Sequence, residues 1–237
     1  MSIQKAPSGF FEWNDQLQGA ASLGVDSDRL EECLAYYHQG KFRSLFGHES
    51  FGFHQDNLDF LAQTINATHL WFWDVTLKNI DALYDLTELE SMGIHPKRPG
   101  IDFSRFPKLQ SVVNHWTKKD TGIADSTITK YNLWHYKPTS KSFAGLEIPL
   151  GVERLELTWA NPASLEGLPV LPKLKEFQIH RCRNLSDLSA LPRIAPNLKK
   201  LLATSSSKLE PTAGIVDHPK LKSAWIEGKE YARGEKS

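Results

Sequence analysis

Residues 174–185 read LKEFQIHRCRNL, with apolar side chains at the first, fourth, sixth, ninth and twelfth positions. The alternation through Phe177, Gln178 and Ile179 is typical of a strand that buries one face. Similar segments recur along the chain, each with an apolar residue at the position of Phe177 and with steps of 19 to 24 residues between them. These marker residues are Leu70, Met92, Val112, Tyr131, Leu155, Phe177, Leu201 and Ala224. Eight units at such even spacing predict a repeat protein.

The segments between these units have a different apolar spacing. Leu165, Leu168, Leu171 and Leu174 follow one another at intervals of three residues, which favours short helices or 3₁₀ turns over strands. One strand cannot bury its apolar face alone, so successive strands are expected to stack in parallel. Because parallel strands lie about 4.8 Å apart and helical segments are thicker, the stack should bend with its strands on the inner, concave wall. The pattern predicts an α/β solenoid.

Over residues 58–227 the sequence resembles the leucine-rich repeat family. The resemblance rests on the form L-x-x-L-x-L-x-x-C-x-x-L of residues 174–185 and on its recurrence. It implies a horseshoe of about eight repeats with parallel strands on the concave face, and it implies partner binding without naming the partner. The units around Val112 and Tyr131 are irregular, so the strand register of residues 110–150 is left open. The ninth position, Asn or Cys in the family, is filled properly only at Cys182, and the equivalent positions hold Val75, Lys97, Ala160 and Ser206.

The two ends of the chain do not repeat. Residues 1–57 are interpreted as an N-terminal cap made of one helix and short strands, because a solenoid needs its terminal core covered. The helix is predicted to begin near Asp26, with Ser27 as its N-cap. Its apolar face is predicted to consist of Leu30, Cys33, Leu34 and Tyr37. The phenylalanines of residues 42–53 favour one or two strands, and residues 228–237 are predicted to form a charged, frayed tail.

Composition excludes several classes of protein. Lys plus Arg and Asp plus Glu both number 28, so the formal net charge is zero. A general binder of nucleic acid or of anionic membranes should be basic, so neither is expected as a partner. No stretch approaches 18 consecutive apolar residues, and the N-terminus lacks the apolar segment of a secretory signal. Two cysteines, Cys33 and Cys182, do not make a disulfide framework, and the chain is therefore expected to be soluble, reduced and cytoplasmic.

Motifs that carry catalysis are missing from the sequence. It contains no glycine-rich phosphate loop, G-x-S-x-G, H-E-x-x-H or C-x-x-C. His95 and His115 should be neighbours in one column of the sheet, but no third Cys or carboxylate ligand lies beside them in the predicted register, so no metal is expected. Nothing in the sequence gives a reason to expect a cofactor. The pattern favours a non-enzymatic protein.

The strand positions that face away from the predicted core suggest a binding surface. Four of the seven tryptophans fall on these positions, and a cluster of exposed tryptophans is typical of an interface. We therefore predict that the concave wall holds a partner protein or peptide. The predicted partner-binding residues are Trp71, Trp73, His95, His115, Trp134, Arg154, Glu156, Glu176, Gln178, His180, Lys200 and Trp225.

Other interpretations of the same residues stay open at this point. The cap could cover Trp71 and Trp73, or a register slip of one residue could turn the outward positions inward. By analogy with the family, a small intracellular binder could act as an adaptor, an inhibitor or a toxin-neutralising immunity protein. The alternative function is that of a carbohydrate-like small-ligand receptor or enzyme with its site between the cap and the first repeats. Self-association through strand edges or Trp225 is a third interpretation, although a monomer is expected.

Overall fold

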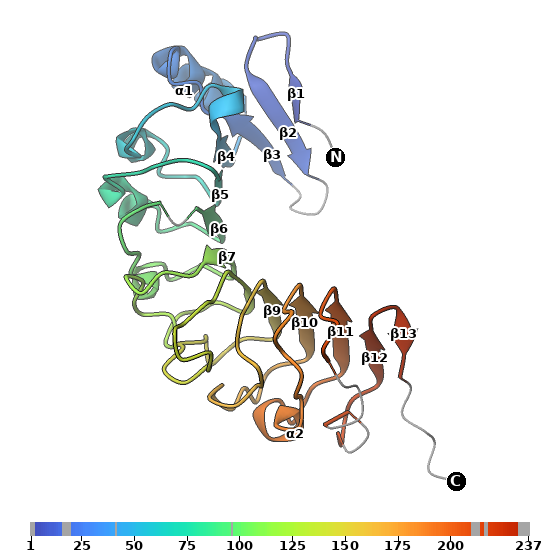
Figure 1. Cartoon of the computed structure of the whole chain (residues 1–237). Coiled ribbons are helices and arrows are strands. Elements are labelled where there is room, and N and C mark those ends of the chain that lie inside the picture. Colours follow the sequence, from blue (N-terminus) through green and yellow to red (C-terminus); the bar gives the residue numbers. More distant parts are fainter. Residues whose placement is uncertain are drawn as a thin grey trace. The chain divides into compact units, whose positions relative to one another are not determined.

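The computed structural model describes residues 3–15, 20–40, 42–95, 97–209, 214–215 and 218–231. Within these ranges the chain forms an α/β structure whose thirteen strands follow one another in chain order in one unclosed sheet (Figure 1). The strands are β1 (Ile3–Lys5), β2 (Phe11–Asp15), β3 (Ala20–Gly24), β4 (Ser44–Gly47), β5 (His69–Phe72), β6 (Ser91–Ile94), β7 (Ser111–His115), β8 (Lys130–Trp134), β9 (Arg154–Thr158), β10 (Glu176–His180), β11 (Lys200–Thr204), β12 (Ser223–Ile226) and β13 (Lys229–Glu230). The helices are α1 (Leu30–Gln39) and α2 (Leu191–Ile194), with 3₁₀ helices η1 (Glu49–Phe51), η2 (Asp59–Gln63), η3 (Asp81–Asp85) and η4 (Phe103–Arg105).

Most neighbouring strands are parallel, as stacked repeats require. Pairing is parallel from β3 to β6 and from β8 to β12, whereas β1, β2 and β3 pair antiparallel, as do β12 and β13. The chain divides into two compact units, which are described separately. Unit 1 is Met1–Val112 with Thr117–Gly122, and unit 2 is Val113–Trp116 with Ile123–Ser237.

The register predicted for the strands is confirmed by the burial of their side chains. All eight marker residues are buried, and in β9 both Leu155 and Leu157 are inaccessible while Glu156 between them is half-exposed. The strands β7 and β8 alternate in the same way, which settles the register that the irregular repeats left open. Each leucine buried in this way contributes about 1.5–3 kcal/mol of transfer free energy, so a slip of one residue would be costly.

The return segments use the apolar spacing of three residues in two ways. Short helices form in four of them, η2, η3, η4 and α2, as predicted. Between β9 and β10 the leucines 165, 168, 171 and 174 are all buried, but this segment contains no helix. Its backbone instead makes separate turns, in which Leu168 N donates to Leu165 O at 3.2 Å and Leu174 N donates to Leu171 O at 3.1 Å. Apolar contact every third residue is therefore compatible with turns alone.

The predicted N-terminal helix is present, but its start differs from the prediction. The helix α1 buries Cys33, Leu34 and Tyr37, and its N-cap is Arg29 without a side-chain hydrogen bond. Ser27 Oγ instead accepts from His54 N at 2.9 Å, which ties the start of the helix to a later loop. The Ser27 hydroxyl therefore makes a tertiary hydrogen bond instead of capping the helix.

The strands of the first 57 residues were predicted only in part. The strand β4 confirms the expectation for residues 42–53, but Glu49–Phe51 form the 3₁₀ helix η1 instead of a strand. The antiparallel strands β1 to β3 were not predicted, because their lengths of three to five residues carry too little periodicity. The prediction of a frayed tail is wrong for Lys229 and Glu230, which form β13, and residues 232–237 lie outside the described residues. None of the helices described here is both long and apolar enough to cross a membrane.

Candidate functional site

The predicted partner-binding residues are divided between the two units. Trp71, Trp73 and His95 belong to unit 1, and the other nine belong to unit 2. Each set lies on outward strand positions or directly after a strand, as the register requires. The outward side chains of β8 to β12, together with the side chains that directly follow these strands, are called the strand face of unit 2 below.

In unit 1, Trp71 lies against a glycine of the next strand. Trp71 on β5 is paired with Gly93 on β6, and a Cβ atom at Gly93 would overlap the indole ring. Phe46 on β4 has the same relation to Gly24 on β3. The two glycines thus leave space for two rings, and as a result Trp71 is half-buried rather than open to solvent.

Trp73 is partly covered by residues of the N-terminal segment. Its ring stacks on His48 with centroids 4.9 Å apart, and it also packs against Phe46 and Phe51 at 6.1 Å and 6.0 Å. Phe46 itself is fully buried, although its strand position faces outward. This is the covering of Trp73 that the alternative interpretation anticipated, and it leaves Trp73 half-buried.

Asp74 lies between two histidines at the ends of neighbouring strands. Its carboxylate is 3.7 Å from His48 Nε2 and 3.5 Å from His95 Nε2. Burial lowers the pKa of His95 most strongly, Asp74 opposes this effect, and Lys97 and Arg98 add to the lowering. Across the described ranges, no group of three or more His, Cys, Asp or Glu side chains could hold a metal ion. The cluster is therefore a set of polar contacts around Asp74.

Unit 1 also contains an open pocket of about 450 Å³ beyond the ends of β4 and β5. Asp56 and Lys78 line it and form an ion pair at 2.8 Å, and Asp74 lies at its edge. Trp71 and Trp73 do not line this pocket. The two tryptophans of the alternative interpretation are therefore not part of this pocket.

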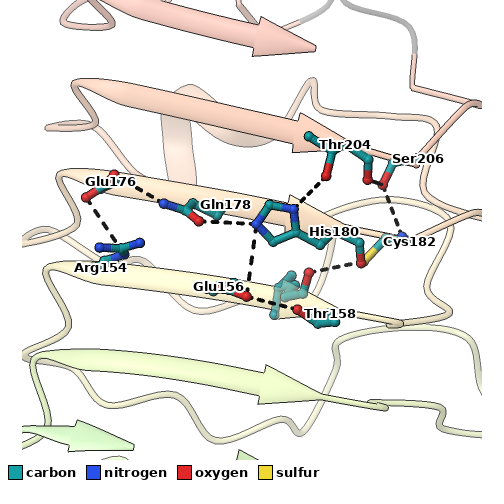
Figure 2. A network of polar contacts seen from close by, with 10 residues as sticks. Arg154, Glu156, Thr158, Glu176, Gln178, His180, Cys182, Thr204 and Ser206 are labelled. Atoms are coloured by element: carbon teal, nitrogen blue, oxygen red, sulfur yellow. Dashed lines mark hydrogen bonds and ion pairs between the residues drawn. The ribbon is translucent and has the colours of Figure 1, made fainter. Parts of the chain in front are cut away.

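In unit 2, the strand face carries a continuous row of polar contacts (Figure 2). Gln178 Nε2 donates to Glu176 Oε1 at 3.2 Å, and Arg154 Nε lies 3.9 Å from the other oxygen of Glu176. Glu156 accepts from Thr158 Oγ1 at 3.1 Å and lies 4.0 Å from His180 Nε2. Five of the predicted partner-binding residues, Arg154, Glu156, Glu176, Gln178 and His180, are thus held by one another on β9 and β10.

His180 has its ring fixed by contacts on both nitrogens. Its Nε2 lies 3.2 Å from Gln178 Oε1, and its Nδ1 lies 2.7 Å from Thr204 Oγ1. Because Gln178 uses its NH₂ group on Glu176, its oxygen faces His180 and can only accept, so Nε2 carries the proton. Nδ1 then accepts from the Thr204 hydroxyl. Such mutual hydrogen bonds restrict the side-chain conformations of this face.

An aromatic cluster lies at the carboxyl ends of β7 to β10. The ring of Trp134 is 5.0 Å from that of His115 and meets Trp159 edge-on at 5.3 Å. His135 stacks almost parallel on Trp159, with centroids 4.7 Å apart and planes 7° apart. The guanidinium carbon of Arg181 lies 5.1 Å from the Trp159 centroid, within cation–π range. The predicted residues His115 and Trp134 are therefore joined to Trp159 and Arg181, which the sequence analysis did not select.

No family model matches the chain, and no curated protein compared with it is significantly similar. The case for a function therefore rests on the side chains that the fold displays.

One position in the repeat holds residues that were not among the predicted partner-binding residues. His135, Trp159, Arg181 and Ser205 each lie four residues after a marker residue and have φ between +52° and +58°. Asp74 in unit 1 has φ +51° and Gly228 has φ +78° at the same position. This left-handed conformation costs about 1–2 kcal/mol for a residue with a Cβ atom, and glycine avoids the cost. Reading the column four residues after each marker would have found these residues from the sequence.

The last strands of unit 2 also carry exposed outward residues. The Trp225 side chain on β12 is 44% exposed, and Lys200 on β11 is exposed. Leu202 is the next outward residue of β11 after Lys200. It is paired with Gln178 on β10 and with Trp225 on β12. The strand face of unit 2 therefore continues from the aromatic cluster through the polar row to an exposed indole.

Both cysteines belong to the core, as predicted for Cys182. Its thiol lies 3.5 Å from Leu157 O, and its backbone N–H donates to Ser206 Oγ at 3.0 Å. Burial raises the pKa of the Cys182 thiol to about 11 and also raises that of Cys33. Ser206, at the equivalent position of the next repeat, is buried too. A small polar residue at this position links successive turns.

Native protein is expected to resist thiol alkylation at about pH 8, because the thiolate is the reactive form and is scarce at both cysteines. Iodoacetamide followed by intact-mass measurement should show no adduct, and the urea-unfolded chain should take up two. A raised pKa of the Cys182 thiol stabilises the folded state below the ordinary thiol pKa of 9.0, and this effect is lost as pH rises to about 11. Rapid native labelling at either residue would contradict the burial seen here.

Proposed function

We propose that this chain is a non-enzymatic leucine-rich repeat protein that binds a partner protein or peptide on the strand face of unit 2. The repeat assignment is supported by parallel strands in chain order and by the buried marker residues. It is supported also by the contacts of Cys182 and Ser206 at the turn where the family has Asn or Cys. The proposal includes the family's horseshoe of about eight repeats with strands on the concave side.

The observation that carries the binding proposal is the strand face itself. Its aromatic and charged side chains cover no core, yet they are ordered by stacking and by hydrogen bonds. Trp, Tyr and Arg dominate binding energy at protein interfaces, and ordered side chains lose less entropy on binding. The exposed indole of Trp225 leaves apolar surface in contact with water, which is unfavourable. A bound partner would cover this surface.

The proposal describes a monomeric cytoplasmic chain whose effect comes from occupying its partner. An inhibitor or a toxin-neutralising immunity protein acts in this way, by covering a functional surface. The zero net charge argues against nucleic acid and anionic membranes as partners. The face suits a discrete polypeptide with both polar and apolar groups.

Site-specific photo-crosslinking in the native host tests this function. A photoreactive amino acid at Gln178 is expected to give a discrete adduct, which Trp134→Ala should weaken at least about tenfold. The matched control is the same amino acid at Val170, which is 49% exposed in the turn segment before β10 and does not belong to the face. Adducts of equal yield at both positions, or none at Gln178, would reject the strand face as the binding site.

A further inference from the structure

The backbone of His135, Trp159 and Arg181, each directly after a strand, has the left-handed conformation. Gly228 occupies the same position in the last described repeat with no steric cost. A bulky side chain in this conformation is disfavoured on its own, so the strain points to a role outside folding. Asp74 and Ser205 are small or polar and carry less weight in this argument.

Arg181 is the residue of the cluster best placed to meet a partner. It is exposed, and its guanidinium lies over Trp159. Among the described residues it forms no ion pair, whereas Arg154 and Arg193 each face a glutamate. A guanidinium presents N–H donors in a planar fork that fits a carboxylate in a bidentate manner. Stacking on Trp159 fixes the direction of that fork.

The other neighbours of Trp159 in this cluster are aromatic side chains. The His135 ring stacks on Trp159, the ring that Arg181 also contacts. The ring centroids of His115 and His135 are 5.5 Å apart. The indole N–H of Trp134 is buried without a hydrogen-bond partner among the residues described. The cluster therefore contains a guanidinium and an indole N–H as donors beside aromatic surfaces. A ligand that complements this cluster would carry carboxylates beside apolar side chains.

We propose that His135, Trp159 and Arg181 form a subsite for an acidic segment of the partner protein, with a carboxylate on Arg181 and an apolar side chain beside the stacked rings. The proposal deepens the function proposed above and rests on it. A nucleic acid fits less well, because Glu156 and Glu176 lie on the neighbouring strands β9 and β10 and would repel a continuous row of phosphates. An acidic peptide can place its few carboxylates at Arg181 alone.

Fluorescence anisotropy with defined peptides tests this subsite. The probe is a short fluorescein-labelled peptide of alternating glutamate and tyrosine, and its glutamine counterpart is the control peptide. Wild-type protein is expected to bind the glutamate peptide at least about tenfold more tightly, with affinity falling as salt rises. Arg181→Gly and Trp159→Gly are each expected to weaken binding about tenfold or more while the melting temperature stays equal or rises.

Two matched variants separate this subsite from general charge and from strain relief. Arg183→Ala removes an exposed cation two residues away and should change affinity less than about twofold. Ser205→Gly relieves the same backbone conformation without touching the stacked rings and should leave affinity unchanged. Equal losses for Arg183→Ala and Arg181→Gly, no preference for glutamate, or tighter binding of a single-stranded oligonucleotide would each overturn the subsite.

The outcome also separates this inference from the proposed function. An adduct at Gln178 in the host together with no glutamate preference leaves the binding function standing and removes the acidic subsite. The absence of any adduct at Gln178 removes both. Loss of melting temperature in Arg181→Gly would show that the side chain supports the fold, and this too would overturn the inference.

Discussion

Replacing Asp120 with alanine is expected to destabilise unit 1 by about 3–5 kcal/mol, because it leaves a buried guanidinium without its counter-charge. The side chains of Arg98 and Asp120 are each 1% exposed and form a two-point ion pair at 2.6 Å and 3.0 Å. Asp120 also accepts from Ile101 N at 3.0 Å, so the carboxylate orders the loop between β6 and β7. Urea denaturation followed by circular dichroism measures the loss.

Two comparisons show whether burial is the cause. Lys108→Ala breaks an exposed pair with Glu88 of similar length and is expected to cost less than about 1 kcal/mol. The double variant Arg98→Met with Asp120→Leu removes both charges and should recover most of the stability. If Asp120→Ala were no more harmful than Lys108→Ala, the buried pair would not be contributing to the fold.

The second large effect is expected from two adjacent leucines on β11. Leu201 is 2% exposed and points into the core, whereas Leu202 is half-exposed on the strand face of unit 2. Leu201→Ala should cost about 2–5 kcal/mol because it leaves a cavity. Leu202→Ala removes the same atoms from the surface and should cost less than about 1 kcal/mol.

The same pair of variants also tests the binding face. Urea midpoints give the stability of both proteins, and crosslinking through Gln178 gives their binding. Leu202→Ala is expected to reduce the adduct at native stability, since Leu202 lies beside Gln178 and Trp225. Leu201→Ala is expected to lower the urea midpoint but to keep the adduct in the absence of urea, where the protein is still folded. Equal destabilisation by the two variants would mean that the alternation of β11 has been assigned wrongly.

Periodicity carried most of what could be predicted about the fold. The marker residues, the strand positions and the outward faces follow from local alternation, and the structure places every marker in the core. Short elements without repetition were beyond this reasoning. The strands β1 to β3 and the true role of Ser27 depend on partners distant in the chain, such as the backbone of His54. Local pattern contains no information on those contacts.

The candidate site was predictable only as a set of outward positions. The register identified Trp134, Gln178 and His180 as outward-facing, but which contacts they make could not be read from it. Trp159 and Arg181 were missed because they follow the strands in a left-handed conformation. The backbone conformation of a single residue has no periodic pattern within one repeat. It becomes apparent only when equivalent positions of successive repeats are compared.

In the repeats, the sequence by itself determined which strand positions point into the core and which point outward, because alternation along a strand is a local property of the backbone. The tertiary structure alone decided how the displayed side chains combine. Trp71 lies against Gly93, the His180 ring contacts Thr204, and Arg181 lies over Trp159. Each of these contacts joins neighbouring repeats some twenty residues apart, so it exists only once the strands are stacked in register.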